Sequence, residues 1–180
     1  KTQYPTEYKV EKVKQLTEKP DITLTVELII TDNEERTIEH AIKSMGFKDI
    51  FLKRRVSYGF YLNSKTNAKT IAEKILASGE IINLNKEVPR ITINEKNYIY
   101  DKTTGLQEET VRDTGTVRYL TTDIDNYFGK STFDKLKPYF PKNEITKVMK
   151  GIEWSLTLKK SETAEKIVAT HIFHNPNSMK

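Results

Sequence analysis

The apolar positions in the first half of this 180-residue chain recur in its second half at a nearly constant distance. Ile38 is followed by Phe133, and Ile50 by Ile145, each 95 positions later. Further matches, at 94 or 96 positions, are Phe60 with Trp154, Leu62 with Leu156, Ala68 with Ala164, Ile71 with Ile167, Ala72 with Val168 and Leu76 with Ile172. A near-constant distance over several segments indicates an internal duplication. The chain is therefore expected to contain two copies of one small unit.

The first copy, residues 22–93, is expected to contain four strands and two helices. Apolar residues that alternate with polar ones predict strands at 22–30, 50–56, 60–62 and, as one bent strand, at 81–84 with 88–93. Apolar residues at helical spacing predict helices at 32–45 and 68–78. Asp32 and Glu35 form a capping-box pattern that begins the first helix, and Gly79 ends the second. A turn is expected at 57–59. The order β-α-β-β-α-β is that of a ferredoxin-like unit, an α+β fold with an antiparallel sheet and both helices on one face.

The second copy, residues 116–180, repeats the order without its closing strand. Strands are expected at 117–122, 145–149 and 152–158, a helix begun by Ser131, and a last helix begun by Ser161 with His171 on its apolar face. A polar linker at 94–115, with a short hairpin near 98–100, would join the copies. The missing strand would leave an open sheet edge, which a second molecule or the N-terminal arm (1–21, through residues 7–16) is expected to complete.

Composition restricts the chemistry that the chain can perform. It contains no cysteine, which excludes disulfides, thiolate metal sites and thiol catalysis. No apolar run approaches the roughly 20 residues that span a bilayer. Both features fit a cytoplasmic protein without a membrane partner. The 30 basic and 25 acidic residues are interleaved, which is typical of a solvated mixed-charge surface and makes a nucleic-acid partner the less favoured reading.

Three motifs partly match known functional sites, and each lacks a residue that such a site needs. Gly129-Lys130-Ser131 lacks the glycine that a phosphate-binding loop needs five residues earlier. The loop Asp123 to Asn126 lacks the glycine and distal glutamate of a calcium site. His171 and His174 have no third metal ligand nearby, and His171 is expected in the core. We therefore expect no catalytic residue, no metal site and no cofactor.

An RNA-binding module is the alternative, because RNA-recognition domains share the β-α-β-β-α-β order. Tyr58-Gly59-Phe60 matches the aromatic-glycine-aromatic centre of their base-stacking strand. The flanking Val56, Ser57 and Asn63 do not match that motif. The first predicted strand also carries no stacking aromatic residue.

The two copies resemble PurS, the small-subunit family of formylglycinamide ribonucleotide amidotransferase (FGAM synthase), over about 22–93 and 116–178. PurS chains carry Gly-Phe after the first helix, Val-Arg-x-Gly-Lys at the central hairpin and Leu-Leu-Ala-Asn-Pro after the second helix. The corresponding segments here are Gly46-Phe47, Val148-Met149-Lys150-Gly151-Ile152, Lys74-Ile75-Leu76-Ala77-Ser78 and Ile172-Phe173-His174-Asn175-Pro176. Arg54 lies where the family arginine would, with Val56 and Ser57 in place of the following Gly-Lys.

The resemblance implies a subunit without chemistry of its own in a purine-biosynthesis enzyme. PurS subunits bridge an ATP-dependent synthetase subunit and a glutaminase subunit, and they aid ammonia transfer between them. PurS units pair with each other, so a homodimer is possible and a fused tandem could supply the pair within one chain. The residues that the resemblance assigns to partner binding are Arg54, Arg55, Lys150, Gly151, Asn175 and Pro176.

Overall fold

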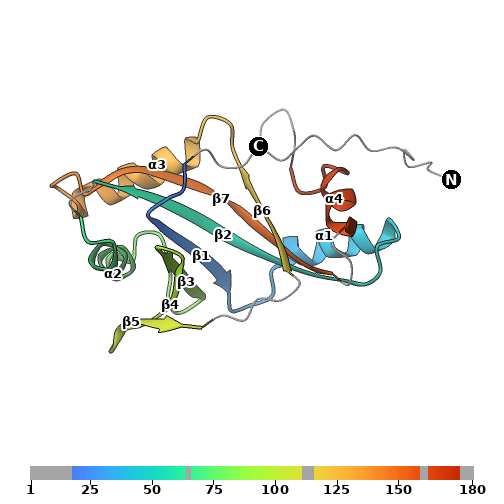
Figure 1. Cartoon of the computed structure of the whole chain (residues 1–180), viewed down its shortest axis with the longest axis horizontal. Coiled ribbons are helices and arrows are strands. Elements are labelled where there is room, and N and C mark those ends of the chain that lie inside the picture. The colour runs from blue at the N-terminus through green and yellow to red at the C-terminus, as the bar shows by residue number, and fades with distance from the viewer. Residues whose placement is uncertain (1–17, 64–65, 111–115, 159–161, 175–180) are drawn as a thin grey trace.

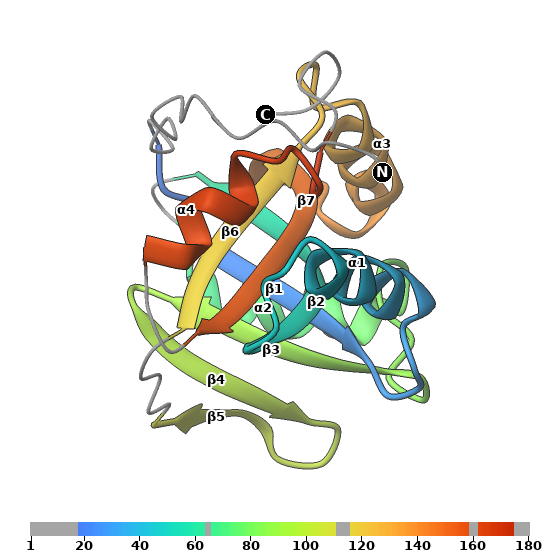
Figure 2. The same ribbon diagram turned by 90° about the vertical axis from the view of Figure 1, so that its right-hand side faces the viewer.

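The computed structural model describes residues 18–63, 66–110, 116–158 and 162–174. Within these ranges the chain forms one antiparallel seven-stranded sheet with the strand order β5-β4-β3-β1-β2-β7-β6, together with α-helices (Figures 1 and 2). The elements are β1 (Ile22–Leu28), α1 (Asn33–Ser44), β2 (Ile50–Leu62), α2 (Ala68–Ser78), β3 (Glu87–Ile93), β4 (Lys96–Asp101), β5 (Gly105–Glu109), β6 (Thr116–Thr122), α3 (Tyr127–Leu136), the 3-10 turn η1 (Lys137–Tyr139), β7 (Ile145–Leu158) and α4 (Glu162–Val168). The expected antiparallel α+β class is confirmed.

Two long strands, β2 and β7, replace the two hairpins that the sequence predicts. β2 has 13 residues and β7 has 14, and they pair with each other from Ile50 opposite Leu158 to Leu62 opposite Ile145. The predicted turn at 57–59 is wrong, because these residues pair with β1 on one side and with β7 on the other. Gly59 lies instead beneath Pro20, whose side chain would stand 3.2 Å from an added Cβ. A glycine is therefore favoured at position 59, because the Pro20 side chain packs closely against the backbone there.

The strand pairing of the first half repeats in the second. Leu24 of β1 lies opposite Tyr58 of β2, and Tyr119 of β6 lies opposite Trp154 of β7. In these two pairs the residues of β1 and β6 are 95 positions apart and those of β2 and β7 are 96 positions apart, close to the spacing of the apolar pattern. Both halves share one continuous sheet, so they do not form separate sheets.

All four helices cover the same face of this sheet, as expected. Leu52, Tyr58 and Phe60 alternate on one face of β2 and are buried. Tyr58 and Phe60 pack in a core with α2 and α3, and Leu52 packs in a second core with α1 and α4. Figure 1 shows these two helix pairs at opposite ends of the sheet. The alternation of Ile152, Trp154, Leu156 and Leu158 in the sequence predicts that Trp154 and Leu156 are buried together, and this is confirmed, since both lie in the second core.

The helix ends confirm part of the predicted capping. The Asp32 carboxylate accepts hydrogen bonds from the backbone N–H groups of Glu34 and Glu35 (2.9 and 3.1 Å) at the start of α1. Gly79, with φ of 69°, ends α2. The Ser131 cap is wrong: α3 begins at Tyr127, so Ser131 lies inside the helix. The Asp123 carboxylate accepts the Tyr127 N–H instead.

The remaining differences concern connections. Residues 81–84 form no strand, and 96–109 form the β4–β5 hairpin, which extends the sheet beyond β3 (Figure 2). α4 ends at Val168, and the expected core position of His171 is wrong, because this residue is exposed. Ser161 and residues 7–16 of the arm lie outside the described residues.

The outer edge of β6 has no neighbouring strand in the described parts of the chain. In the first half, β3 occupies the equivalent side of β1. None of the helices found in the described ranges has the length and apolar content to cross a membrane.

Candidate functional site

The residues that the resemblance assigns to partner binding lie on different faces of the central strand pair. Arg54 and Lys150 are on the helix-covered face, and Arg55 is on the opposite face, which carries no helix. Gly151 lies between β2 and β6. Asn175 and Pro176 lie outside the described residues. The structure therefore brings Arg54 and Lys150 into related positions and separates Arg55 from both.

Two cation–aromatic pairs join the halves of the chain. The Arg54 guanidinium lies 5.8 Å from the Trp154 ring centroid, and the Lys150 Nζ lies 5.3 Å from the Tyr58 ring centroid. In each pair the two residues are directly opposite on β2 and β7. Lys150 follows Arg54 by 96 residues, and Trp154 follows Tyr58 by the same 96. The paired strands β2 and β7 thus carry one cation and one aromatic ring each on this face of the sheet.

Arg54 is neutralised by the chain's own carboxylates. Its guanidinium contacts Asp32 at 3.0 Å and Glu34 at 2.7 Å. Its backbone N–H donates to the Glu35 carboxylate (2.8 Å), and the Leu52 N–H donates to the Glu39 carboxylate (3.3 Å). β1 pairs with β2 only from Val56 onward, so these α1 side chains cover the otherwise open edge of β2.

Two donors at this centre have no partner. The Nε of Arg54 and the Nε1 of Trp154 are buried without a hydrogen bond among the described residues. Buried donors normally find an acceptor. The Arg54–Trp154 contact is therefore held by stacking and by the two ion pairs of the guanidinium, and the indole N–H does not contribute.

Lys150 has a different environment from Arg54. It is half-buried, and it forms no ion pair with any residue in the described ranges. Burial lowers the pKa of Lys150, and the neighbouring charge of Lys135 lowers it further, against the opposing effect of Glu87. Lys150 is therefore a half-buried cation over the Tyr58 ring, with no ion pair among the described residues.

Arg55 belongs to a charge network on the face without helices. Its guanidinium contacts Glu27 (3.1 Å), Glu153 (3.4 Å) and the Ser155 hydroxyl (3.0 Å). Burial alone would raise the pKa of Glu27, but hydrogen bonds and charges from Lys53 and Arg55 outweigh it and hold that pKa below its ordinary value. The network spans β1, β2 and β7, so Arg55 links the two halves.

Gly151 is required by packing. A Cβ added there would lie 2.4 Å from the Thr121 carbonyl oxygen and 2.8 Å from the Thr122 side chain. Any larger residue would push β6 away from β7. The glycine that resembles a family motif is thus explained by strand proximity.

The aromatic residues of the RNA-binding alternative are not available to bases. Tyr58 and Phe60 face the helices and belong to the core under α2 and α3. Burial raises the pKa of Tyr58 to about 12. Base stacking requires exposed rings on the open sheet face, so these two residues cannot form such a platform.

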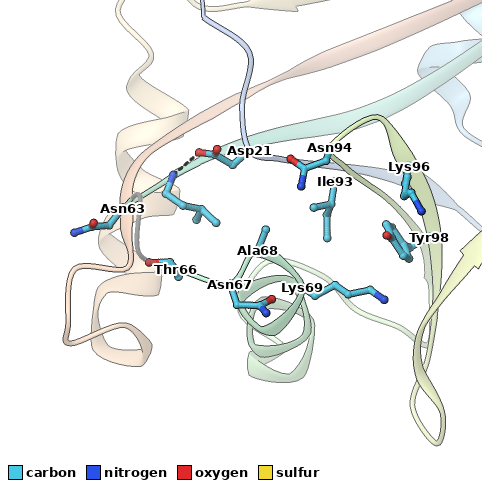
Figure 3. Close-up of a pocket in the computed structure, with 11 residues that line it drawn as sticks. Asp21, Asn63, Thr66, Asn67, Ala68, Lys69, Ile93, Asn94, Lys96 and Tyr98 are labelled. Carbon is cyan, nitrogen blue, oxygen red and sulfur yellow. Dashed lines mark hydrogen bonds between the residues drawn. The ribbon is translucent and has the colours of Figure 1, made fainter.

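A pocket of about 500 Å³ lies between the start of α2, the end of β2 and the β3–β4 turn (Figure 3). Its polar groups are mostly used within the chain. Asp21 accepts the Leu62 N–H (2.7 Å), Asn67 accepts the Thr70 N–H (3.2 Å), and the Lys69 Nζ lies 4.8 Å from the Tyr98 ring centroid. The lining presents no nucleophile beside a base.

The described residues contain no group of three or more metal-ligating side chains of His, Asp or Glu. In the loop considered for a cation, the Asn126 amide donates to the Val148 carbonyl (2.7 Å), and Asp123 binds the start of α3. His171 and His174 lie edge to face, with ring centroids 5.2 Å apart. The second carboxylate oxygen of Asp123 and the amide oxygen of Asn126 are buried without a hydrogen-bond partner among the described residues.

Comparisons with known proteins give no relative. No protein-family model, no curated protein and no solved structure matches the chain.

Proposed function

We propose that this chain is a non-catalytic scaffold subunit of the PurS type, with two ferredoxin-like units fused in tandem. In this role it bridges the synthetase and glutaminase subunits of FGAM synthase in the cytoplasm and aids ammonia transfer between them. The observation that carries the proposal is the continuous sheet through β2 and β7, on whose two sides the same strand pairing recurs. Two separate subunits would associate in this way to form a dimer.

The two halves depend on each other for burial, as an obligate pair would. The core under α2 and α3 includes Val148 and Leu136 from the second half. The core under α1 and α4 includes Leu52 and Ile42 from the first half. Neither half encloses its apolar residues alone, so the fused pair is the folding unit.

The exposed surface supports a binding role. Several large apolar side chains are solvent-exposed; those more than half exposed are Ile29, Ile30, Phe51, Tyr127 and Phe128. Clusters of exposed apolar residues are typical of surfaces that contact other proteins. Ile29 and Ile30 lie in the β1–α1 loop, and Tyr127 and Phe128 begin α3.

The test is reconstitution with the synthetase and glutaminase subunits encoded in the same genome. We expect the three chains to co-elute in size-exclusion chromatography. Glutamine-dependent product formation should require this chain, whereas formation from added ammonium should not. The proposal is wrong if the chain binds neither subunit and its omission leaves glutamine-dependent activity unchanged.

A further inference from the structure

The pocket at the start of α2 contains a buried tyrosine whose hydroxyl has no partner. Tyr98 lines this pocket, its side chain points into it from β4 (Figure 3), and only 6% of the residue is exposed to solvent. Within the described parts of the chain, no residue forms a hydrogen bond with the hydroxyl. Buried tyrosine hydroxyls normally find a hydrogen-bond partner. A molecule bound in the pocket can supply one.

Lys69 brings a positive charge to the same wall of the pocket. Its Nζ lies 4.8 Å from the Tyr98 ring centroid, and it forms no ion pair with any described residue. Lys96 also lines the pocket, and its Nζ contacts Glu108 at 3.2 Å. Asp21 is the acidic residue of the lining, and its carboxylate already accepts a backbone N–H at 2.7 Å. The lining therefore has an excess of positive charge, and Lys69 is the cation available to a ligand.

The first turn of α2 adds backbone donors to the pocket. Within this 11-residue helix, the Thr70 N–H donates to the Asn67 side chain (3.2 Å) and the Ile71 N–H to the Asn67 carbonyl (3.1 Å). The N–H groups of Ala68 and Lys69 have no acceptor among the described residues, and both residues line the pocket. The start of a helix carries a partial positive charge and is a common binding place for phosphate groups.

The rest of the lining includes an apolar surface. Leu62, Ala68, Ile93 and the Tyr98 ring contribute to it, and the pocket volume is about 500 Å³. Pockets of roughly 300–1,000 Å³ with mostly apolar walls and a few well-placed polar groups are typical of sites for small organic molecules. The apolar residues and the positively charged helix start together select a ligand that has an organic body and one anionic group.

We propose that this pocket binds a small organic phosphate ester. The phosphate lies at the start of α2, where it accepts hydrogen bonds from the Lys69 ammonium and the Tyr98 hydroxyl. The organic part of the ester packs against Leu62 and Ile93. This inference goes beyond the proposed scaffold function and does not depend on it, because the site is formed by the first half of the chain and needs no partner protein.

The experiment is an NMR titration of the full chain with phenyl phosphate. We expect saturable shifts of the Lys69 and Tyr98 amide resonances. Lys69→Gln should weaken binding about tenfold or more, because a charge-assisted hydrogen bond is lost. Tyr98→Phe removes only the hydroxyl and should weaken binding about threefold or more. Lys74→Gln is the matched control, since Lys74 is an exposed lysine of the same helix outside the pocket lining, and it should leave the affinity unchanged.

Two analogues test the chemical class of the ligand. Benzyl alcohol, which carries no charge, should cause no saturable shift, and benzoate, a carboxylate, should bind more weakly than phenyl phosphate. The inference is wrong if phenyl phosphate causes no saturable shift, or if neither Lys69→Gln nor Tyr98→Phe weakens its binding. Benzoate binding as tight as that of phenyl phosphate would also overturn it, since the site would then belong to carboxylates. The spectrum of each variant shows independently that it is folded.

Discussion

The guanidinium of Arg54 lies over the ring of Trp154, and these two residues come from opposite halves of the chain. The contact is at the junction of β2 with β7, beside the core that α1 and α4 cover. Lys150 and Tyr58 repeat the arrangement 96 residues apart, with the cation and the ring exchanged between the strands. The junction between the halves is therefore the part of the molecule on which several measurable properties depend.

Truncation of Trp154 should be strongly destabilising. The side chain is 2% exposed and packs against Phe173 with ring centroids 5.0 Å apart. We expect Trp154→Ala to lower the free energy of unfolding by about 3–5 kcal/mol, through lost burial and the cavity left behind. Phe51→Ala is the control, because Phe51 is 56% exposed, and it should change stability by about 0.5 kcal/mol or less. Similar urea midpoints for the two variants would show that Trp154 lies outside the core.

Replacing Arg54 should lower the stability of the protein, whereas replacing Lys150 should leave it nearly unchanged or raise it. Arg54→Gln leaves the partly buried Asp32 carboxylate without its cation, so we expect a loss of about 2 kcal/mol. Lys150→Gln removes a half-buried charge that has no ion pair among the described residues, and it should change stability by about 0.5 kcal/mol or less, or raise it. Chemical denaturation of both variants at neutral pH checks this. Equal losses would mean that Lys150 has an anionic partner within the chain.

The network around Glu27 should make stability depend on acid pH. The folded-state pKa of Glu27 lies below the ordinary value of 4.5, so the unfolded chain binds its proton more tightly than the folded chain. The contribution to stability is therefore present above pH 4.5 and is lost as the pH falls through the lower folded-state pKa. Glu27→Gln should lose less stability than the parent over that range, as measured by denaturation at several pH values. Parallel curves for the two proteins would contradict the network.

RNA binding should be weak and steeply dependent on salt. With Tyr58 and Phe60 buried, the base-stacking strand that the motif predicts is lost, so we expect lysine and arginine contacts to phosphates to dominate binding. Fluorescence anisotropy with single-stranded RNA should show affinity that falls sharply as salt is raised. Tight, sequence-selective binding at physiological salt would revive the RNA-binding alternative.

The open edge of β6 should be covered by another strand. β6 has seven residues and one neighbouring strand in the described structure, whereas β1 lies between two. An uncovered edge invites strand addition, so we expect the β6 amides that do not bind β7 to exchange hydrogen as slowly as those of β1. Hydrogen-exchange mass spectrometry at several protein concentrations measures this.

The concentration dependence identifies what covers β6. Slow exchange that is independent of concentration and lost on deletion of residues 1–17 would assign the N-terminal arm. Slow exchange that is lost on dilution would assign a second copy of the chain. Fast exchange of these amides under all conditions would show that the edge stays open.

The sequence alone determined the α+β class of the fold and several of its elements. Buried faces recur at fixed spacing in each helix and strand, so the apolar pattern located α1, α2, β1 and the burial of Trp154. The caps at Asp32 and Gly79 were also predictable, because they depend on hydrogen bonds and backbone conformations within a few residues.

Only the tertiary structure decided whether the central strands turn or continue. Gly59 and Gly151 looked like turn residues, but in each case a strand or loop from elsewhere in the chain packs against the glycine. The contacts of Arg54 with Trp154 and of Lys150 with Tyr58 also followed from the alignment of β2 with β7. Such contacts join residues up to about 100 positions apart, and local periodicity carries no information about which distant strand will lie alongside.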